Sequence, residues 1–315
     1  MNKIIRIGTR GSKLALWQAE YVASLIRPSG FQPEIVAIET RGDRVLDVAI
    51  AKIGSKGVFT EEIEAKLLDH TIDIAIHSAK DLSSEVPDEL ELIGFTEREL
   101  PNDVIVSKRR DIDLSGEITV GTASTRRVAF LKHFYPNAKA VMIRGNLQTR
   151  FNKLESGECD ALLLAFAGVH RMGYDHLIVE QIATSYFVPA VGQGCIAIEC
   201  HKKLPYQKKE IISRWVNHAA TENCVRAERA FLKTMHGGCS IPVFGYAQYE
   251  GELITLKGGI ISLDGSRIVK AKSSAPPDQL KALGESVARD VLNDGGQDIL
   301  AEIKNQQLQE AENRP

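Results

Sequence analysis

The stretch Thr71–Leu82, with the sequence TIDIAIHSAKDL, decides how the rest of the chain can be interpreted. In its first half, three isoleucines alternate with aspartate and alanine, which predicts a β-strand. This strand leads into residues 77–81, where a histidine, a serine, a lysine and an aspartate come close together. Ligands of open α/β sheets bind beyond the carboxyl ends of the strands. We therefore expect Lys80 and Asp81 at a functional site, although on this stretch alone a solvated Lys-Asp pair in a turn is the commoner case.

The composition is that of an ordinary soluble protein. The chain has 315 residues, enough for two or three domains, with 43% apolar residues, 25% charged residues and a net charge of −2. So small a net charge gives no global field that favours nucleic acid or anionic membranes, and no run is apolar over the length of a membrane helix. The N-terminus lacks the apolar core of a secretory signal, and the five cysteines are few and odd in number. These features predict a cytoplasmic protein without nucleic-acid or membrane partners.

The N-terminal segment predicts a strand, a turn and a helix. A short apolar run at 4–7 is followed by Gly8-Thr9-Arg10-Gly11-Ser12 and then by apolar residues at helical spacing. Ser12 fits an N-cap, and Trp17 is expected in the core. A turn of this kind presents free backbone N–H groups to an anion, and Arg10 adds a bidentate donor for a carboxylate or a phosphate.

A second candidate element is the glycine-rich segment at 51–59, AKIGSKGVF, which precedes a predicted helix at 60–68. A segment of this composition can be a mobile lid that carries Lys56 and Phe59 toward a ligand. An ordinary surface loop fits the same residues equally well.

Arginines follow the ends of several predicted strands. After residues 97–101 the alternation of strands and helices restarts, which marks a hinge between two lobes. The arginines at or just beyond strand ends are Arg10, Arg126, Arg127, Arg144, Arg150 and Arg171. Each of them alone is more often a solvated surface residue. Together, in a protein of near-neutral charge, they predict a basic cleft for a ligand with several phosphates or carboxylates, and no Walker or G-x-G-x-x-G motif distinguishes between the two.

The order of predicted elements gives the fold class, an α/β protein with two lobes and a smaller α+β C-terminal domain. Residues 1–98, with a return segment at 192–214, are expected to form lobe 1. Residues 99–191 are expected to form lobe 2, and residues 215–315 the C-terminal domain. Two lobes joined by crossing segments would enclose a cleft.

The C-terminal domain is predicted to contain an antiparallel three-stranded sheet. Three alternating runs are separated by Glu250-Gly251 and Asp264-Gly265, which are typical hairpin turns. Helices near 277–292 and 298–304 are expected to complete the domain. The polar tail at 305–315 is expected to be frayed.

Cys239 stands among small residues in the segment HGGCSIP at 236–242. Lone cysteines are mostly buried and inert, and the C-terminus of a helix does not lower the pKa of a thiol, so position alone predicts no activated nucleophile. No histidine is placed as a partner by spacing. Cys195, Cys200 and His201 lack the second close pair that a zinc site needs, and we expect no metal.

Several blocks, in this order, resemble the hydroxymethylbilane synthase family, also called the porphobilinogen deaminase family. The resemblance covers nearly the whole chain and rests on residues 7–18, 52–59, 77–81, 121–127, 144–146, 164–171, 189–194 and 237–239. It implies a three-domain fold whose first two domains are similar to the lobes of type II periplasmic binding proteins. It also implies a transferase that adds four porphobilinogen molecules head to tail to a bound dipyrromethane, releasing ammonia and then hydroxymethylbilane, in tetrapyrrole (haem) biosynthesis.

The same resemblance implies roles for individual residues. Cys239 would hold the dipyrromethane cofactor through a thioether, and Asp81 would be the catalytic residue that stabilises positive charge on a ring nitrogen and handles protons. The residues implied to hold the cofactor are Ser78, Lys80, Asp81, Thr122, Ser124, Arg126, Arg127 and Arg144. Those implied to bind porphobilinogen or the growing polypyrrole are Arg10, Ser12, Arg144, Arg150, Arg171, Gln193 and Gly194, with Lys56 and Phe59 in the lid.

Two other functions are compatible with parts of the sequence. A non-catalytic two-lobed binding protein for a polycarboxylate ligand would need the same fold and the same arginines. A thiol-dependent acyl transferase is less well supported, because no histidine–cysteine pair is evident. For the enzyme we expect a monomer.

Overall fold

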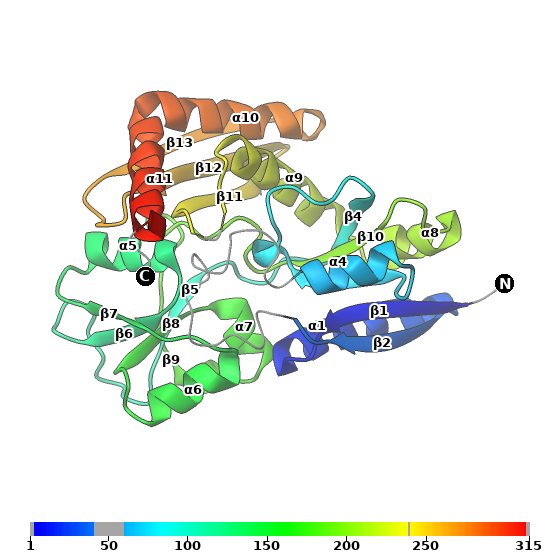
Figure 1. Cartoon of the computed structure of the whole chain (residues 1–315), viewed down its shortest axis with the longest axis horizontal. Helices are drawn as coiled ribbons and strands as arrows, with labels where there is room; N and C mark the ends of the chain where they lie inside the picture. The colour runs from blue at the N-terminus through cyan, green and yellow to red at the C-terminus, as the bar shows by residue number, and fades with distance from the viewer. Residues whose placement is uncertain (1–2, 41–59, 239, 313–315) are drawn as a thin grey trace.

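The computed structural model describes residues 3–40, 60–238 and 240–312 of the chain. These residues form three β-sheets with helices packed on them, in three regions of the molecule (Figure 1). Lobe 1 and lobe 2 each contain a five-stranded sheet, and the C-terminal domain contains a three-stranded sheet. The predicted fold class, two α/β lobes and an α+β domain, is confirmed.

The sheet of lobe 1 includes one strand that comes from far along the chain. Its strands, in spatial order, are β2 (Gln32–Ile38), β1 (Ile4–Arg10), β3 (Ile74–Ser78), β10 (Ile196–His201) and β4 (Leu90–Phe95). β1 is parallel to β2 and β3, whereas β10 is antiparallel to β3 and β4. The helices packed on this sheet are α1 (Lys13–Ile26), α4 (Glu61–Leu68) and α8 (Tyr206–Trp215).

The sheet of lobe 2 repeats this arrangement. Its strands, in spatial order, are β7 (Lys139–Met142), β6 (Thr119–Thr122), β8 (Ala161–Ala165), β5 (Asp103–Val106) and β9 (Ile178–Gln181). β6 is parallel to β7 and β8, whereas β5 is antiparallel to β8 and β9. The helices α5 (Thr125–Phe134), α6 (Leu147–Glu155) and α7 (Phe166–Arg171) belong to this lobe. In each sheet the antiparallel strand is therefore the one that crosses over from the other lobe.

The central strands of both lobes are buried on both faces. Every residue of β10 and of β5 is buried, and β3 and β8 are buried up to their last residue. The alternating isoleucines at 72–76 thus belong to a strand that is buried on both faces, not to a strand with one face exposed to solvent. Asp73 is also buried, and it is compensated by ion pairs with Arg6 and Lys208.

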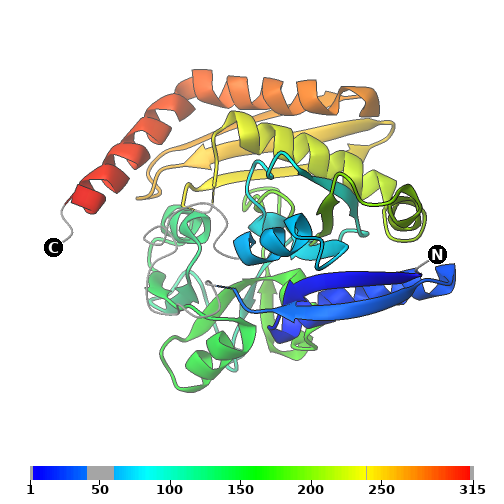
Figure 2. The same cartoon turned by 45° about the vertical axis from the view of Figure 1, so that its right-hand side comes forward.

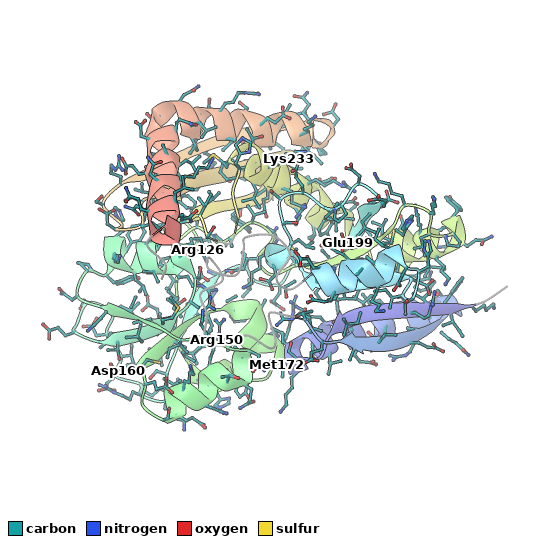
Figure 3. All side chains as sticks on the ribbon, in the orientation of Figure 1. Arg126, Arg150, Asp160, Met172, Glu199 and Lys233 are labelled. Carbon is teal, nitrogen blue, oxygen red and sulfur yellow. The ribbon has the colours of Figure 1, made fainter. Side chains whose placement is uncertain are left out.

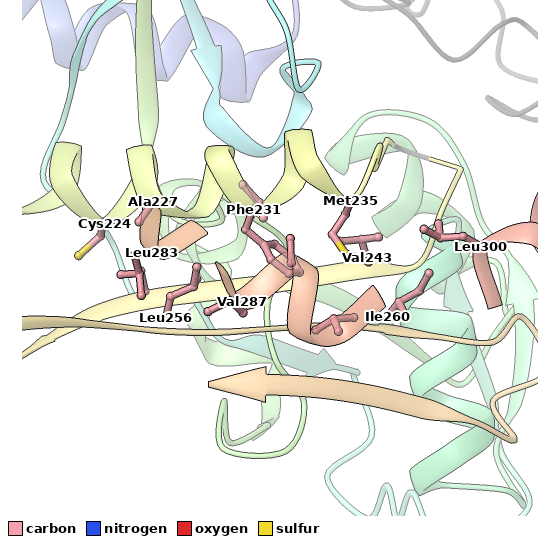
Figure 4. Packing of buried hydrophobic residues seen from close by; sticks show 14 of the residues in the cluster. Cys224, Ala227, Phe231, Met235, Val243, Leu256, Ile260, Leu283, Val287 and Leu300 are labelled. Atoms are coloured by element: carbon pink, nitrogen blue, oxygen red, sulfur yellow. The ribbon is translucent and has the colours of Figure 1, made fainter. Parts of the chain in front are cut away.

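The C-terminal domain packs helices on its three-stranded sheet. Its strands are β11 (Val243–Glu250), β12 (Leu253–Ile261) and β13 (Ile268–Ala275), all antiparallel. Its helices are α9 (Ala219–Thr234), α10 (Leu280–Val291) and α11 (Gln297–Glu312). Figure 4 shows Phe231 of α9, Leu256 of β12 and Val287 of α10 in one core. Gly284 of α10 allows the two helices to touch, since a Cβ there would lie 2.4 Å from the Ala227 carbonyl oxygen.

The polar tail at 305–315 was predicted to be frayed, but its described part, residues 305–312, is helical. α11 continues to Glu312 and descends from α10 toward lobe 2 (Figures 1 and 2). Ile299, Leu300 and Ile303 fix its first turns because they are buried in the core of the domain. Further on, Gln307 Nε2 donates to the Ser240 carbonyl at 3.4 Å. Fraying was predicted because the later turns of this helix are polar.

The domain limits predicted at 98/99, 191/192 and 214/215 stay predictions. Among the described residues, no helix has the length and apolar content that crossing a membrane requires.

Candidate active site

A cavity of about 1290 Å³ lies between the three parts of the chain. Lobe 1 contributes Asp81 after β3, lobe 2 contributes Arg126 and Arg150, and the C-terminal domain contributes Gly238 and Ser240. In Figure 3, Arg126 and Arg150 lie in the central region of the molecule. The cavity therefore lies beyond the carboxyl ends of the parallel strands, and it exceeds the roughly 300–1,000 Å³ of an ordinary small-molecule pocket.

Most residues that the sequence singled out line this cavity. They are Arg10, Ser12, Ser78, Lys80, Asp81, Ser124, Arg126, Arg127, Arg144, Arg150, Arg171, Gln193 and Gly194. Thr122 does not line it, because it is buried at the end of β6, where its hydroxyl accepts a hydrogen bond from the Ser124 N–H at 3.3 Å. Lys56, Phe59 and Cys239 lie outside the described residues.

On the lobe 1 side, a 3-10 turn at Ala79–Asp81 places Asp81 in the cavity wall. The turn is fixed from behind by the segment that precedes β10. The Ala79 N–H donates to the Cys195 carbonyl at 3.0 Å. Gly192 has φ +72°, and a Cβ there would lie 2.9 Å from the Cβ of Ala79, so this approach requires glycine.

Lys80 is a half-buried cation in this wall. Burial lowers the pKa of Lys80 to about 8, and the charge of Arg127 acts in the same direction. Its Nζ donates to Gln193 Oε1 at 3.4 Å. A carboxylate of a ligand would supply the opposite charge that favours the ammonium form.

On the lobe 2 side, Asp103 binds both arginines of the pair at 126–127. Its Oδ2 accepts from Arg126 Nη2 at 2.7 Å, and its Oδ1 accepts from Arg127 Nε and Nη2 at 2.9 and 2.7 Å. Burial alone would raise the pKa of Asp103, but the charges of Arg126 and Arg127 lower it to about 2. Two guanidinium groups against one carboxylate leave this cluster with one net positive charge.

Most donors of the two arginines are already used inside the protein. Arg127 Nη1 donates to the Leu163 carbonyl at 3.2 Å, and Arg126 Nη1 donates to the Val188 carbonyl at 2.9 Å. Arg126 Nε is buried and has no partner among the residues that the structure describes. A ligand carboxylate would therefore be attracted mainly by the net positive charge of this cluster. Few N–H donors of the two arginines remain for bidentate hydrogen bonds to it.

Asp103 was missed in the sequence analysis, although the arginine pair carried a signal for it. Two adjacent arginines in the first turn of a helix oppose its dipole, so a compensating anion had to lie nearby. Gln18 was also overlooked: its Nε2 donates to Ser78 Oγ at 2.9 Å and holds that hydroxyl in the wall. Both partners come from distant parts of the chain, which no local pattern reveals.

The remaining arginines of lobe 2 are desolvated cations. Burial, and then the charge of Arg127, lower the pKa of Arg150 to about 10. Its Nε donates to the Gly145 carbonyl at 2.9 Å. Burial also lowers the pKa of Arg144 and of Arg171. A polyanionic ligand would offset the desolvation of these three arginines. Desolvated cations that line one cavity are typical of an anion-binding site.

Arg171 also connects the lobes. Its Nη2 donates to the Gly194 carbonyl at 2.7 Å, and its guanidinium carbon lies 5.6 Å from the centre of the Trp17 ring. Trp17 is 38% exposed, so the prediction that it belongs to the core was wrong. It lies on α1 where that helix approaches α7 of lobe 2.

A buried ion pair ties all three parts together behind the cavity. Arg98 donates from Nη1 and Nη2 to the two carboxylate oxygens of Glu228 at 2.7 and 3.0 Å. Glu228 also accepts from the N–H groups of Gly192 and Ala247 at 2.7 and 2.8 Å. Burial alone would lower the pKa of Arg98, but Glu228 raises it well above its usual value. The pair therefore joins the hinge, the return segment and the sheet of the C-terminal domain.

Fold and site together define a class: a two-lobed α/β protein with a cationic cavity between its lobes and an added C-terminal domain. Solved structures with some likeness to the chain include the VFT2 domain of BvgS from Bordetella pertussis, 14% identical, covering 72% of this chain and 92% of that chain with a TM-score of 0.43. The methionine binding protein MetQ is 12% identical, covering 68% and 90%, with a TM-score of 0.42. Likenesses at this level carry no argument about function.

Relatives by sequence are much closer. The family profile described as "Porphobilinogen deaminase, dipyromethane cofactor binding domain" matches residues 5–208, and "Porphobilinogen deaminase, C-terminal domain" matches residues 222–293. The curated porphobilinogen deaminase of Desulfosudis oleivorans is 53% identical over 306 residues, 96% of this chain and 99% of that protein. That of Cytophaga hutchinsonii is 52% identical, over 96% and 98%. The chain belongs to the porphobilinogen deaminase family.

The described residues fit a dipyrromethane cofactor. The cavity is large enough for several pyrrole rings, and its wall is rich in cations, of which Lys80 and Arg150 have their pKa values lowered by desolvation. Gly238 and Ser240, on either side of Cys239, both line it. The buried and unpartnered Arg126 Nε offers a donor for an anionic group. Among the described residues, no group of three His, Cys, Asp or Glu side chains is arranged to hold a metal.

Proposed function

We propose that the protein is a transferase that joins four porphobilinogen molecules head to tail on a covalently held dipyrromethane, releasing ammonia and then hydroxymethylbilane. The observation that carries this proposal is the convergence of Asp81 and six arginines on a single cavity in a chain of the porphobilinogen deaminase family. When bound, the dipyrromethane supplies the pyrrole end to which new units are added. The chain's own residues bind, orient and handle protons around it.

Asp81 is the residue we assign to the chemistry. Loss of ammonia leaves positive charge on the pyrrole of the substrate, and a fixed carboxylate stabilises charge that develops in this way. The turn at Ala79–Asp81 is held from behind, so the Asp81 carboxylate is preorganised. The same carboxylate can accept the proton that each addition releases.

The cations of the cavity are assigned to the carboxylates of the pyrroles. Every unit carries an acetate and a propionate, so each addition increases the negative charge in the cavity. Lys80, Ser78, Ser124 and the cluster of Asp103 with its two arginines would act on the cofactor, with Arg144 between cofactor and substrate. Arg10, Ser12, Arg150, Arg171, Gln193 and Gly194 would act on the incoming pyrrole and the growing chain.

Cys239 is the proposed attachment point. The four other cysteines are buried and unpaired, and burial raises the thiol pKa of each, to about 12 for Cys200 and about 11 for Cys224. Only the thiolate is a good nucleophile, so these four are poor candidates. Unpaired cysteines also fit a reducing compartment, and we propose a cytoplasmic monomer.

Intact mass tests the function. The protein incubated with porphobilinogen is expected to carry the mass of a bound dipyrromethane, and to show transient further additions of single pyrrole units. Cys239→Ala is expected to carry no pyrrole, whereas the matched control Cys224→Ala is expected to load normally, because it removes a thiol from the core.

The rival function is a binding protein for a polycarboxylate. It predicts that porphobilinogen binds without any covalent gain in mass. A mass equal to that of the bare chain after incubation would therefore overturn the proposal, and an adduct that survives in Cys239→Ala would overturn the attachment point.

A further inference from the structure

A second, smaller chamber lies beside the main cavity and leads from Asp81 to a buried histidine. Its volume is about 70 Å³. Its walls include Asp81, Ser78, Gln18, Thr60 and His77. The first three of these also line the main cavity, so the chamber opens at the carboxylate that we assign to the chemistry.

The chamber is polar and roomy enough for water. One buried water needs roughly 10–15 Å³ of such volume and two to four polar partners. A chamber of about 70 Å³ has room for a short chain of waters. Its hydroxyl, amide, imidazole and carboxylate groups can each hydrogen-bond to one, and the bond between Gln18 and Ser78 keeps part of the wall in place.

His77 is held in this wall by Glu199. His77 Nε2 and Glu199 Oε2 are 3.1 Å apart, and the two side chains are 4% and 0% exposed. His77 lies on β3 and Glu199 on the neighbouring strand β10, where Figure 3 labels it. A carboxylate at Nε2 favours the tautomer with the proton on that nitrogen. Nδ1 is then the ring nitrogen that can accept a proton, on a residue that lines the chamber.

The polar groups around the His77–Glu199 pair are buried at a cost in folding free energy. Glu199 Oε1 and Arg229 Nη1 are both buried without a partner among the described residues. Burial, together with the charge of Glu199, raises the pKa of Glu64 on α4. Apolar side chains in place of such a pair would often be neutral or stabilising. A histidine–glutamate pair in the core of a sheet, next to a reacting carboxylate, therefore points to a functional reason.

Arg229 joins the pair to the loop that follows Asp81. Its Nη2 donates to the carbonyls of Ser83 and Ser84 at 2.9 and 3.3 Å. The charge of Glu199 acts on the same guanidinium. His77 before the Ala79–Asp81 turn and the Ser83–Ser84 segment after it are thus both connected to the buried cluster of Glu199 and Arg229.

We propose that His77, oriented by Glu199, is a positioning residue that accepts protons from Asp81 through water in the side chamber. The proposal rests on the proposed function, in which Asp81 takes up a proton with each added pyrrole. The proton passes from the Asp81 carboxyl to a chamber water, and a proton of that water passes to His77 Nδ1; no bond between heavy atoms changes. Asp81 is ionised again for the next addition, and the imidazolium is paired with the Glu199 carboxylate. The proton returns to solvent through the mouth of the chamber.

Steady-state kinetics of His77→Gln and Glu199→Gln test this assignment. Both variants are expected to carry the bound dipyrromethane and to keep KM within about twofold, because neither residue lines the main cavity. The kcat is expected to fall about tenfold, less than the roughly 10²–10⁴-fold that a direct general acid or base contributes, because His77 acts through Asp81 and water. The solvent deuterium effect on kcat is expected to increase, because proton removal becomes slower. His176→Gln, which changes an exposed histidine, is the matched control.

A second measurement needs neither turnover nor a loaded cofactor. The ¹⁵N NMR shifts of the His77 ring in the unloaded protein are expected to show a proton on Nε2 and none on Nδ1. Glu199→Gln is expected to give a mixture of tautomers. A proton on Nδ1 in the unsubstituted protein would overturn the proposal, even where a variant fails to fold.

The outcomes separate this inference from the proposed function. If the unsubstituted protein gains no mass from porphobilinogen, the function itself fails. If it turns over normally and His77→Gln keeps kcat within twofold with an unchanged deuterium effect, only the role of His77 fails.

Discussion

The two lobes use the same strand order for different tasks. In each sheet the crossing strand is antiparallel and carries a buried carboxylate, Glu199 on β10 of lobe 1 and Asp103 on β5 of lobe 2. Asp103 is neutralised by two arginines, whereas Glu199 binds a histidine. The residues that follow the strands differ between the lobes in a similar way. Lobe 1 places Asp81 in the cavity, and lobe 2 places most of the arginines there.

This difference teaches that the scaffold does not dictate the chemistry. Two arginines on one carboxylate form a permanent charge, which suits the holding of anions. A histidine on a carboxylate can take up and release a proton, which suits the handling of protons. The crossing strands of two similar sheets thus carry carboxylates at different positions, Asp103 at the start of β5 and Glu199 inside β10, and we propose binding for the one and reaction for the other.

The largest expected effect comes from breaking the lobe 2 cluster. Asp103→Asn leaves two buried guanidinium groups without a carboxylate, so the free energy of unfolding is expected to fall by about 3–5 kcal/mol. Urea unfolding followed by circular dichroism measures this loss. Asp111→Asn removes an exposed partner of Arg109 and is expected to leave the urea midpoint unchanged. Equal midpoints for the two variants would show that the cluster contributes nothing.

The lobe 1 carboxylate is expected to matter for rate and not for stability. Asp81→Asn should lower kcat by about 10²–10³-fold, because a preorganised charge at the reacting centre is lost. The variant should unfold at the same urea concentration, since Asp81 is only half-buried. Asp88→Asn, an exposed change in the same loop, is the control. Activity of Asp81→Asn near that of Asp88→Asn would contradict the assignment.

Acid sharpens the comparison between the lobes. The folded protein holds the pKa of Asp103 at about 2, against an ordinary value of 3.8. A lowered carboxyl pKa stabilises the fold above the ordinary value, and this stability is lost as pH falls from about 4 to 2. The expected loss is about 2 kcal/mol. Unfolding measured between pH 5 and 2 should show a shallower decline in Asp103→Asn, and parallel curves would contradict this.

The smallest expected effect concerns Lys80. Its pKa of about 8 means that it loses its charge as pH rises through 8, which weakens its attraction for carboxylates. The rate at which unloaded protein acquires the dipyrromethane mass is expected to fall, by up to about tenfold between pH 7 and 9. Lys80→Arg stays charged over this range and should remove that decline. If both proteins respond to pH alike, another group is responsible.

Much of the site could be predicted because local sequence patterns indicate both the residue types and their places at strand ends. Arginines after strand ends could be counted, and the strand order that brings those ends together follows from alternating strands and helices. In the structure all six line one cavity. Thr122 was expected at the site and lies behind it, because it ends a strand whose last residue faces inward.

The partners of these residues could not be predicted. Asp103 is distant in sequence from the arginines that it binds, Gln18 is distant from Ser78, and Glu199 is distant from His77. In the sequence, Asp103 is only an acidic residue at the start of an apolar run, and Glu199 is only an acidic residue within another apolar run. Only the crossing of two strands between the lobes gives each of them its partner.

The sequence by itself determined the class of fold, the presence of a cluster of arginines at strand ends and the family, because these depend on periodicity, residue type and the order of motifs. The tertiary structure alone decided which cations are already neutralised, which are desolvated, and that a chamber joins Asp81 to His77. The physical reason is that desolvation and charge pairing depend on distances between residues far apart in the chain, and no local pattern encodes those distances.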